Sequence, residues 1–237
     1  MENTGYVTLT RQSGLMREMQ IVANNIANSA TTGYRQEGLV FSEYVQKSDN
    51  NSSVSMGYGG AGNTSMMQGT MTQTNGPFDL AIEGNGFFLV ETPSGERLTR
   101  AWAFTPNAQG DLVTSDGYRV LDGGGAPVFI PANVSGLKIA PDGTISADGQ
   151  PIGQVGLYQP IDPTRMTRED GVMFNSDEGF ENATSAQILQ GFLEGSNVDA
   201  ISQLARMIEV QRAYELGQSF LESEDQRIRD SVKSLLK

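Results

Sequence analysis

The sequence predicts an α+β protein in which helices at both chain ends pair as a coiled-coil stalk and flank a central, mainly β domain of hairpins. Heptad patterns at the two ends and glycine turns roughly every eight to twelve residues between them support this prediction. The chain divides accordingly into an N-terminal helix with an extended segment at 1–45, a polar connector at 46–76, a β-rich domain with an irregular return at 77–190, and a C-terminal helix at 191–237.

The C-terminal pattern predicts one helix from about residue 198 to residue 235. This stretch lacks proline and has Gly217 as its single glycine, so the helix would be roughly 55 Å long. Asn197 or Asp199 can cap its start. A helix cannot bury its own stripe, so this seam needs partner helices. The seam positions alternate in steps of three and four: Leu204, Met207, Gln211, Tyr214, Gln218, Leu221, Asp225, Ile228, Val232 and Leu235.

The N-terminal residues 3–28 repeat the same spacing. Leu15 and Val22 broaden the apolar stripe there. We therefore expect the two chain ends to be mutual partners, with an ordinary helical hairpin inside a globular protein as the alternative. The N-terminal seam consists of Leu9, Gln12, Met16, Met19, Ala23 and Ile26.

Asparagines gather where the first helix ends, at Asn24, Asn25 and Asn28. Asparagine is unfavourable inside a helix but bonds well to neighbouring backbone, or to the backbone of a partner. Thr31-Thr32-Gly33 then breaks the helix, because Gly33 can adopt a positive φ. The asparagines are either polar residues of a helix end or groups that fix the register of a packed layer.

The connector is rich in Ser, Asn, Gly, Met and Thr, which predicts a segment without regular structure. Residues 34–45 before it should be extended or weakly helical. So long a featureless segment is unusual inside a compact domain but suits a strap along a neighbouring subunit. The connector side chains able to pack on a partner are Tyr58, Met66, Met67 and Met71.

Short apolar runs punctuated by glycine turns occupy the region from about Asn75 to Pro163. The runs at 86–90 and 127–130 are typical of strands, and Asp-Gly and Ser-Gly pairs between such runs are typical of hairpin turns. Residues 164–195 then look mostly irregular, with turns at 170–171 and 178–179.

The composition excludes several classes of function. A net charge of −12 argues against nucleic acid and anionic membrane surfaces as partners. The chain has neither cysteine nor histidine, which removes disulfides, thiol and histidine catalysis and nearly all zinc sites, so we expect no metal and no cofactor. We also expect no membrane insertion and no cleaved signal peptide, because a long apolar run and a basic leader are lacking.

An enzyme is the main rival interpretation. Asp79 and Glu83, or Asp142 and Asp148, could serve as the two carboxylates of a periplasmic glycan hydrolase. Asp-Gly pairs are far more often turns, however, and the glycines at 57–62 lack the strand and the Lys-Ser/Thr of a phosphate loop. We therefore expect no catalytic residues. A self-contained binding module remains a third possibility.

Three segments of the sequence resemble the signatures of flagellar rod and hook proteins. They are ANNIANSATTGYR at 23–35, DLAIEGNGFFLV at 79–90 with LTR at 98–100, and QGFLEGSNVD at 190–199 with MIEVQRAYE at 207–215. The segments occur in the family's order and extend over the whole chain. The sequence departs from the usual pattern at 101–104, Ala30 and Gly195.

The resemblance implies a structural subunit of the flagellar basal-body rod, more similar to proximal-rod members than to distal-rod or other axial members, which remain alternatives. Members of the family are exported by the flagellar type III apparatus without signal cleavage and assemble helically in the rod that crosses the periplasm. Their ends are typically disordered before assembly and form an inner coiled-coil layer afterwards. Partners would be other copies and neighbouring rod proteins, and the role would be to transmit torque.

The residues expected at the assembly interface lie on the two predicted helices and at their junctions with the central domain. They are Leu9, Met16, Met19, Ala23, Asn24, Asn25, Ile26, Asn28, Thr32, Gly33, Asn197, Val198, Leu204, Met207, Gln211, Tyr214, Leu221, Ile228, Val232 and Leu235.

Overall fold

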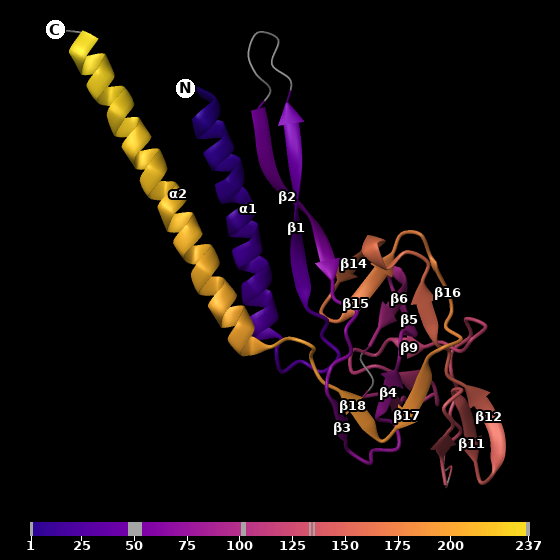
Figure 1. Ribbon diagram of the computed structural model, residues 1–237. Helices are drawn as coiled ribbons and strands as arrows, with labels where there is room; N and C mark the ends of the chain where they lie inside the picture. Colours follow the sequence, from indigo (N-terminus) through magenta and orange to yellow (C-terminus); the bar gives the residue numbers. More distant parts are fainter. Residues whose placement is uncertain (1, 47–53, 101–102, 133, 135, 236–237) are drawn as a thin grey trace. The chain divides into compact units, whose positions relative to one another are not determined.

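The computed structural model describes residues 2–46, 54–100, 103–132, 134 and 136–235. The chain forms two compact units, and each is assembled from segments distant in sequence. The helix unit consists of Met1–Ala27, Glu37–Asn63 and Asp199–Lys237, and the β unit of Asn28–Gln36 and Thr64–Val198. The α+β class predicted from the sequence is confirmed, with helices at both ends and a mostly β region between them (Figure 1).

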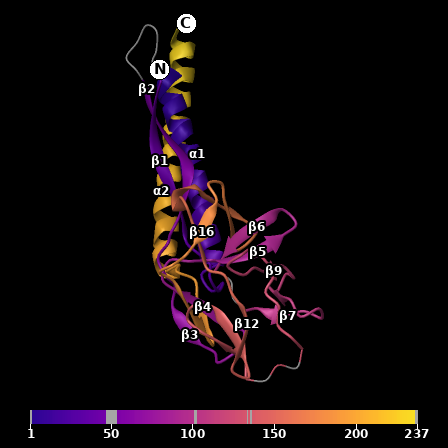
Figure 2. The same cartoon turned by 90° about the vertical axis from the view of Figure 1, so that its right-hand side faces the viewer.

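The helix unit contains helix α1, Glu2–Ala27, and helix α2, Ala200–Leu235. They lie side by side in both views (Figures 1 and 2) and run antiparallel, because Asn25 bonds Gln203 near one end and Gln12 bonds Tyr214 further along. Asp199 caps α2, since its carboxylate accepts bonds from the Ile201 N–H at 3.0 Å and the Ser202 hydroxyl at 2.7 Å. Of the two capping candidates, Asp199 is therefore the one used.

Strands β1, Glu37–Gln46, and β2, Val54–Thr64, pair with each other in the same unit. The prediction of a connector without regular structure is thus wrong for its described part, which contains β2 and β3. Glycine and serine have low strand propensity, but ladder bonds to β1 and contact of β1 with α1 outweigh it. A Cβ at Gly14 of α1 would lie 2.7 Å from the Phe41 ring, so glycine leaves the space that β1 occupies.

The β unit is built from short strands, as the turn spacing predicts. Within its described residues, seven strands form one sheet in the order β14-β15-β6-β5-β9-β8-β7, and the others pair in smaller sheets. The strand bounds are β3 Met71–Gln73, β4 Leu80–Glu83, β5 Phe88–Thr92, β6 Gly95–Thr99, β7 Thr105–Pro106, β8 Leu112–Val113, β9 Arg119–Val120, β10 Lys138–Ile139, β11 Thr144–Ala147, β12 Gln150–Gln154, β13 Tyr158–Pro160, β14 Met166–Glu169, β15 Met173–Ser176, β16 Phe180–Asn182, β17 Gln187–Gln190 and β18 Phe192–Glu194, with a 3₁₀ turn at Pro163–Arg165.

The return segment 164–195 is more regular than expected. Strand β15 pairs with β6, β17 with β4, and β18 with β3. These partners are distant in sequence, so no local period could indicate them. The expected turns are present, with positive φ at Asp170, Gly171 and Gly179.

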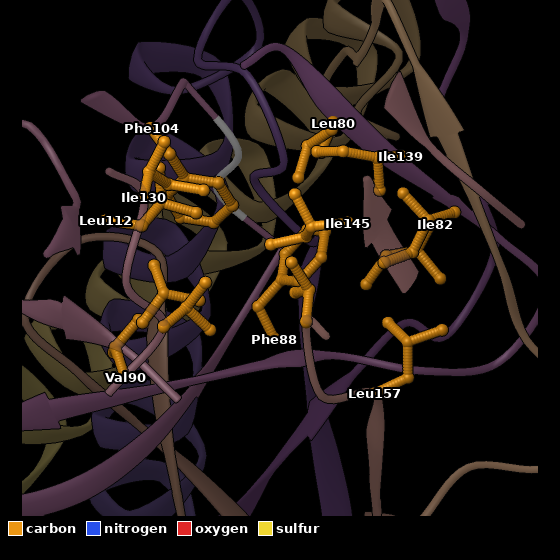
Figure 3. Close-up of a cluster of buried hydrophobic side chains, with 14 of the residues drawn as sticks. Leu80, Ile82, Phe88, Val90, Phe104, Leu112, Ile130, Ile139, Ile145 and Leu157 are labelled. Atoms are coloured by element: carbon orange, nitrogen blue, oxygen red, sulfur yellow. The ribbon is translucent and has the colours of Figure 1, made fainter. Parts of the chain in front are cut away.

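The core of the β unit lies on both faces of β5. Phe88 and Val90 belong to the larger apolar cluster shown in Figure 3, and Phe87 and Leu89 to a second cluster. Successive residues of a strand point to opposite faces, so a strand covered on both sides reads as an uninterrupted apolar run. This explains the GFFLV segment.

Candidate assembly surface and junction cluster

The two helices of the helix unit meet along one row of residues on each, which we call the contact row. On α1 its buried members are Leu15, Glu18, Val22 and Asn25. On α2 the row contains buried Gln203 and Val210 and half-buried Met207, Tyr214, Gly217 and Leu221.

The contact row coincides only in part with the predicted seams, which share Met207, Tyr214 and Leu221 with it. Leu9 is 53% exposed, Met16 48% and Leu204 52%. These three side chains therefore do not pair α1 with α2, in contrast to the prediction. Both helices carry apolar residues on adjacent rows, and periodicity does not tell such rows apart. Specific contacts between α1 and α2 determine which row of each helix faces the other. A Cβ at Gly217 would lie 3.2 Å from the Gln12 side chain, so glycine permits the close approach of the two helices there.

An ion pair and a buried amide also select the contact row. Arg206 Nε donates to Glu18 Oε1 at 2.7 Å. Hydrogen bonding to Glu18 raises the pKa of Arg206. At the other end, Asn25 Nδ2 donates to Gln203 Oε1 at 3.1 Å. Buried polar groups accept few alternative partners, so these contacts fix the helix register.

Asn25 connects three elements of the helix unit. It is 1% exposed, its Nδ2 donates to the Glu37 carbonyl at 2.7 Å, and its Oδ1 accepts the Glu37 N–H at 3.0 Å. Together with Gln203 these bonds join α1, β1 and α2. Asn28 instead accepts the Thr31 hydroxyl at 3.1 Å, as a helix-end residue does. Of the two roles expected for the asparagines, fixing the register therefore applies to Asn25, and the role of a helix-end residue applies to Asn28.

Large apolar side chains lie exposed beside the contact row, on what we call the apolar band. It consists of Leu9 and Met16 of α1 and Leu204 and Ile208 of α2. Leu9 and Met16 follow the contact row by roughly 120° on α1, as Leu204 and Ile208 do on α2. Because the helices are antiparallel, a rotation toward higher residue numbers brings both sets to the same side of the pair. The band is therefore a shared surface of two chain ends.

The structure places the remaining expected interface residues in several environments. Exposed positions are Ala23, Asn24, Gln211, Ile228, Val232 and Leu235, half-buried positions are Met19, Ile26, Thr32, Asn197 and Val198, and Gly33 is buried.

The β unit contains a buried ionic group that we call the junction cluster: Arg35, Arg100 and Glu194. Glu194 Oε1 lies 3.0 Å from Arg35 Nη2, and its Oε2 lies 2.9 Å from Arg100 Nη1. All three side chains are 1% exposed. Burial lowers the pKa of Arg100 to about 10 against the opposing charge of Glu194, and burial likewise lowers the pKa of Arg35. Removing one partner from such a group typically costs about 3–5 kcal/mol.

Backbone carbonyls satisfy part of the remaining guanidinium capacity, while among the described residues Arg35 Nε, Arg35 Nη2 and Arg100 Nε are buried without a hydrogen-bond partner, Nη2 having only its ion pair with Glu194. Arg100 donates to the carbonyls of Ile82 at 3.0 Å and Gly84 at 2.5 Å, and Arg35 donates to Met66 at 3.3 Å. These bonds bring β4 and the segment before β3 to the junction cluster. Charge-assisted bonds of this kind are stronger than neutral ones.

Arg168 holds the N-terminal segment from another side. Its guanidinium lies 4.2 Å from the Tyr34 ring centre and 4.7 Å from that of Phe174, and it donates to the Arg35 carbonyl at 2.5 Å. Cation–π contact with two rings fixes Tyr34 beside the sheet. The aromatic and basic residues of the Gly-Tyr-Arg motif therefore act in packing.

Asn197, near the C-terminal end of the β unit, bonds two segments of that unit that come much earlier in the sequence. Its Oδ1 accepts the Gln36 N–H at 2.6 Å, and its Nδ2 donates to the Met67 carbonyl at 2.7 Å. Gly33, at φ 64°, donates its N–H to the Glu194 carbonyl at 2.8 Å. The sequence patterns indicate Gly33 and Asn197 but not the junction cluster. The missed signal was that each of three separate motifs carries one charged residue able to pair when buried.

Of the four carboxylates in the rival enzyme interpretation, Asp142 and Asp148 serve turns, and Glu83 is an exposed residue at the end of β4. Asp142 accepts the Thr144 N–H at 2.9 Å, and this bonding lowers the Asp142 pKa. Asp148 adopts φ 49° in the next turn, and Asp79 accepts the Thr74 hydroxyl at 2.6 Å. Glycines 57–62 lie in β2, a strand and not a loop. Among the described residues, no group of three acidic side chains is placed to hold a metal ion, and no helix is long and apolar enough to cross a membrane.

Profiles of known families match most of these elements. Residues 6–35 match the flagella basal body rod protein family, 81–147 the D1 domain of flagellar hook protein FlgE/F/G, and 189–233 the C-terminal region of flagellar basal body rod FlgEFG proteins. The chain belongs to the flagellar basal-body rod protein family.

Individual relatives specify the likeness further. The chain is 39% identical to the flagellar basal-body rod protein FlgF of Caulobacter vibrioides, over 99% of this chain and 98% of the relative. It is 33% identical to FlgF of Mesorhizobium japonicum over the same shares of each. Identity to FlgG of Caulobacter vibrioides is 32%, over 92% of this chain and 95% of the relative. The similarity is thus to FlgF-type rod proteins along the full chain.

Proposed function

We propose that this chain is a structural subunit of the proximal rod of the bacterial flagellar basal body, which assembles helically through its terminal helices and transmits motor torque to the hook and filament. The full-length similarity to FlgF proteins supports the proximal assignment, and the lower identity to FlgG in the same organism supports it over other rod members. The family places the chain in the flagellar basal body.

The observation that carries the assembly mechanism is the apolar band. It presents four large apolar side chains that the described chain leaves exposed. Burying each against a neighbour would contribute about 1.5–3 kcal/mol. A contact between unlike surfaces of successive copies generates a helical array when the rotation between copies does not close into a ring. Neighbouring copies and other rod proteins are the partners that this surface suits.

Export and location complete the proposal. The chain would leave the cell by the flagellar type III apparatus without signal cleavage and take its place in the periplasmic part of the rod. The acidic balance of 28 carboxylates against 16 basic side chains argues against nucleic acid as a partner. The carboxylates that accept turn bonds support a structural over a hydrolytic role.

A substitution in the apolar band tests the assembly mechanism. Leu204→Asp should prevent assembly of the rod, because the charge would have to be buried against a neighbour. The matched control is Leu216→Asp, which places the same charge on a 73% exposed leucine of the same helix outside the band. Rod assembly is measured from isolated basal bodies and swimming of cells that carry only the variant. Normal rods with Leu204→Asp would refute the role of the band.

A further inference from the structure

The chain passes between its two units at residues 27–28, 36–37, 63–64 and 198–199. On the β-unit side, the chain next to these crossings forms three segments, 28–36, 64–70 and 191–198. Each segment contributes to the junction cluster or is bonded to it. Arg35 comes from the first, Gly69 of the second donates its N–H to Glu194 Oε1 at 2.9 Å, and Glu194 comes from the third.

We propose that Arg35, Arg100 and Glu194, with Asn197, are positioning residues that tie the chain crossings together and to the β sheet, so that torque from the terminal helices enters the β unit through all the crossings at once. This inference rests on the proposed function. It assigns a mechanical role to a buried ionic group that periodicity and turn patterns do not indicate.

The bonds between the crossing segments are both ionic and backbone. Gly33 donates its N–H to the Glu194 carbonyl at 2.8 Å, and the Asn197 N–H donates to the Tyr34 carbonyl at 3.2 Å. Gly195 donates its N–H to the Thr70 carbonyl at 2.7 Å. The first and third segments are thus bonded directly, and the second is bonded to the third.

The sheet anchors this group through Arg100. Its guanidinium bonds Glu194 and the carbonyls of Ile82 and Gly84, at the end of β4 and just beyond it, and lies 5.4 Å from the Phe87 ring centre. Arg100 directly follows β6, a strand of the seven-stranded sheet. The Glu194 carboxylate and Arg100 therefore connect all three crossing segments to two sheets, in addition to the bond from Arg168 of β14 to the first segment.

Buried ionic bonds are suited to holding the three crossing segments in fixed positions. Charge-assisted bonds in a buried site have few alternative partners, and water cannot replace them until the segments separate. Without the cluster, only backbone hydrogen bonds and the bonds of Asn197 would hold the crossing segments to one another. With it, opening one segment also requires breaking charge-assisted bonds to the others.

Hydrogen exchange of the full-length chain, resolved by peptide, tests the tie. Glu194→Gln keeps the side-chain shape but leaves two buried guanidinium groups without an anion, so exchange in 28–36, 64–70 and 191–198 should rise about 100-fold or more. The matched control Glu178→Gln alters the exposed pair with Arg165 and should change nothing in these segments. An unchanged pattern in Glu194→Gln would overturn the proposal.

Asn197→Ala provides a second variant that changes no charge. It should speed exchange in 33–36 and 65–67 about tenfold, while β5 and β6 keep their protection. If both variants instead raise exchange uniformly through the β unit, the cluster is only part of the general core and the tie is refuted.

Rotation of tethered beads separates a mechanical role from a structural one. Motors built with Asn197→Ala subunits should turn small beads normally and fail as bead size increases, with Asn182→Ala, at an exposed asparagine of β16, as the control outside the cluster. Equal performance at every bead size would contradict the proposal. Failure of the wild-type chain to enter rods would refute the proposed function instead, with the exchange results unaffected.

Discussion

At the scale of single residues, position in the structure separates side chains that look alike in sequence. Asn24, Asn25 and Asn28 belong to one motif, yet Asn25 is buried and bonded to β1 and α2, Asn24 is exposed, and Asn28 bonds its own helix end. The motif therefore combines register, surface and capping roles.

Asn25→Ala should destabilise the helix unit by about 1–3 kcal/mol, because it leaves the Glu37 backbone groups and Gln203 without their buried partner. Denaturant unfolding followed by helix circular dichroism measures this loss. Asn24→Leu is the companion variant: it should change stability far less and impair rod assembly. Equal stability of Asn25→Ala and wild type would show that water replaces the bonds.

At the scale of elements, the close approach of the chain just before β3 to the chain just after β18 depends on Gly69. A Cβ at Gly69 would lie 2.0 Å from the Gly195 carbonyl oxygen, a separation that real atoms do not adopt. Gly195, at which the sequence departs from the family pattern, thus stands opposite a glycine. The pairing of these strands brings the third crossing segment to the second.

Gly69→Ala should lower the melting temperature of the β unit by several degrees, because the backbone must shift where the chain just before β3 meets the chain just after β18. Calorimetry measures the shift. Gly123→Ala is the control, since a Cβ there meets nothing within 4 Å and the backbone needs no positive φ. A melting temperature within a degree of wild type in Gly69→Ala would contradict the steric argument.

At the scale of the whole molecule, the two units have separate cores. The β unit is built around the clusters on either side of β5, and the helix unit around the contact row. Each unit takes segments from both ends of the sequence, so neither corresponds to a continuous stretch of chain.

Val22→Asp should unfold the helix unit and leave the β unit folded, because the new carboxylate would be buried at a position that is 4% exposed while Arg206 is already paired with Glu18. Peptide-resolved hydrogen exchange measures both units in one experiment. Ala23→Asp, on the exposed neighbouring position, should leave both protected. Loss of protection throughout the chain in Val22→Asp would show that the units fold as one.

The sequence alone determined the fold class, the two long helices, the glycine turns and the family. Each depends on local information: a repeat of three and four residues, a glycine that takes positive φ, or a motif read in order. The domain boundaries at 1–45, 46–76, 77–190 and 191–237 stay predictions, and so do the residues expected at the assembly interface. The structure groups the chain differently, into the helix unit and the β unit.

Only the tertiary structure decided which row of each helix meets the other, that part of the connector becomes strand β2, and that Arg35, Arg100 and Glu194 meet. Adjacent apolar rows such as those of Leu9 and Leu15 have the same period, so the period does not show which row faces the other helix. The contacts at Gly217 and Gln203 determine it. Strand pairing and buried ion pairs join residues far apart in sequence, and their energies depend on burial, which exists only once the chain has folded.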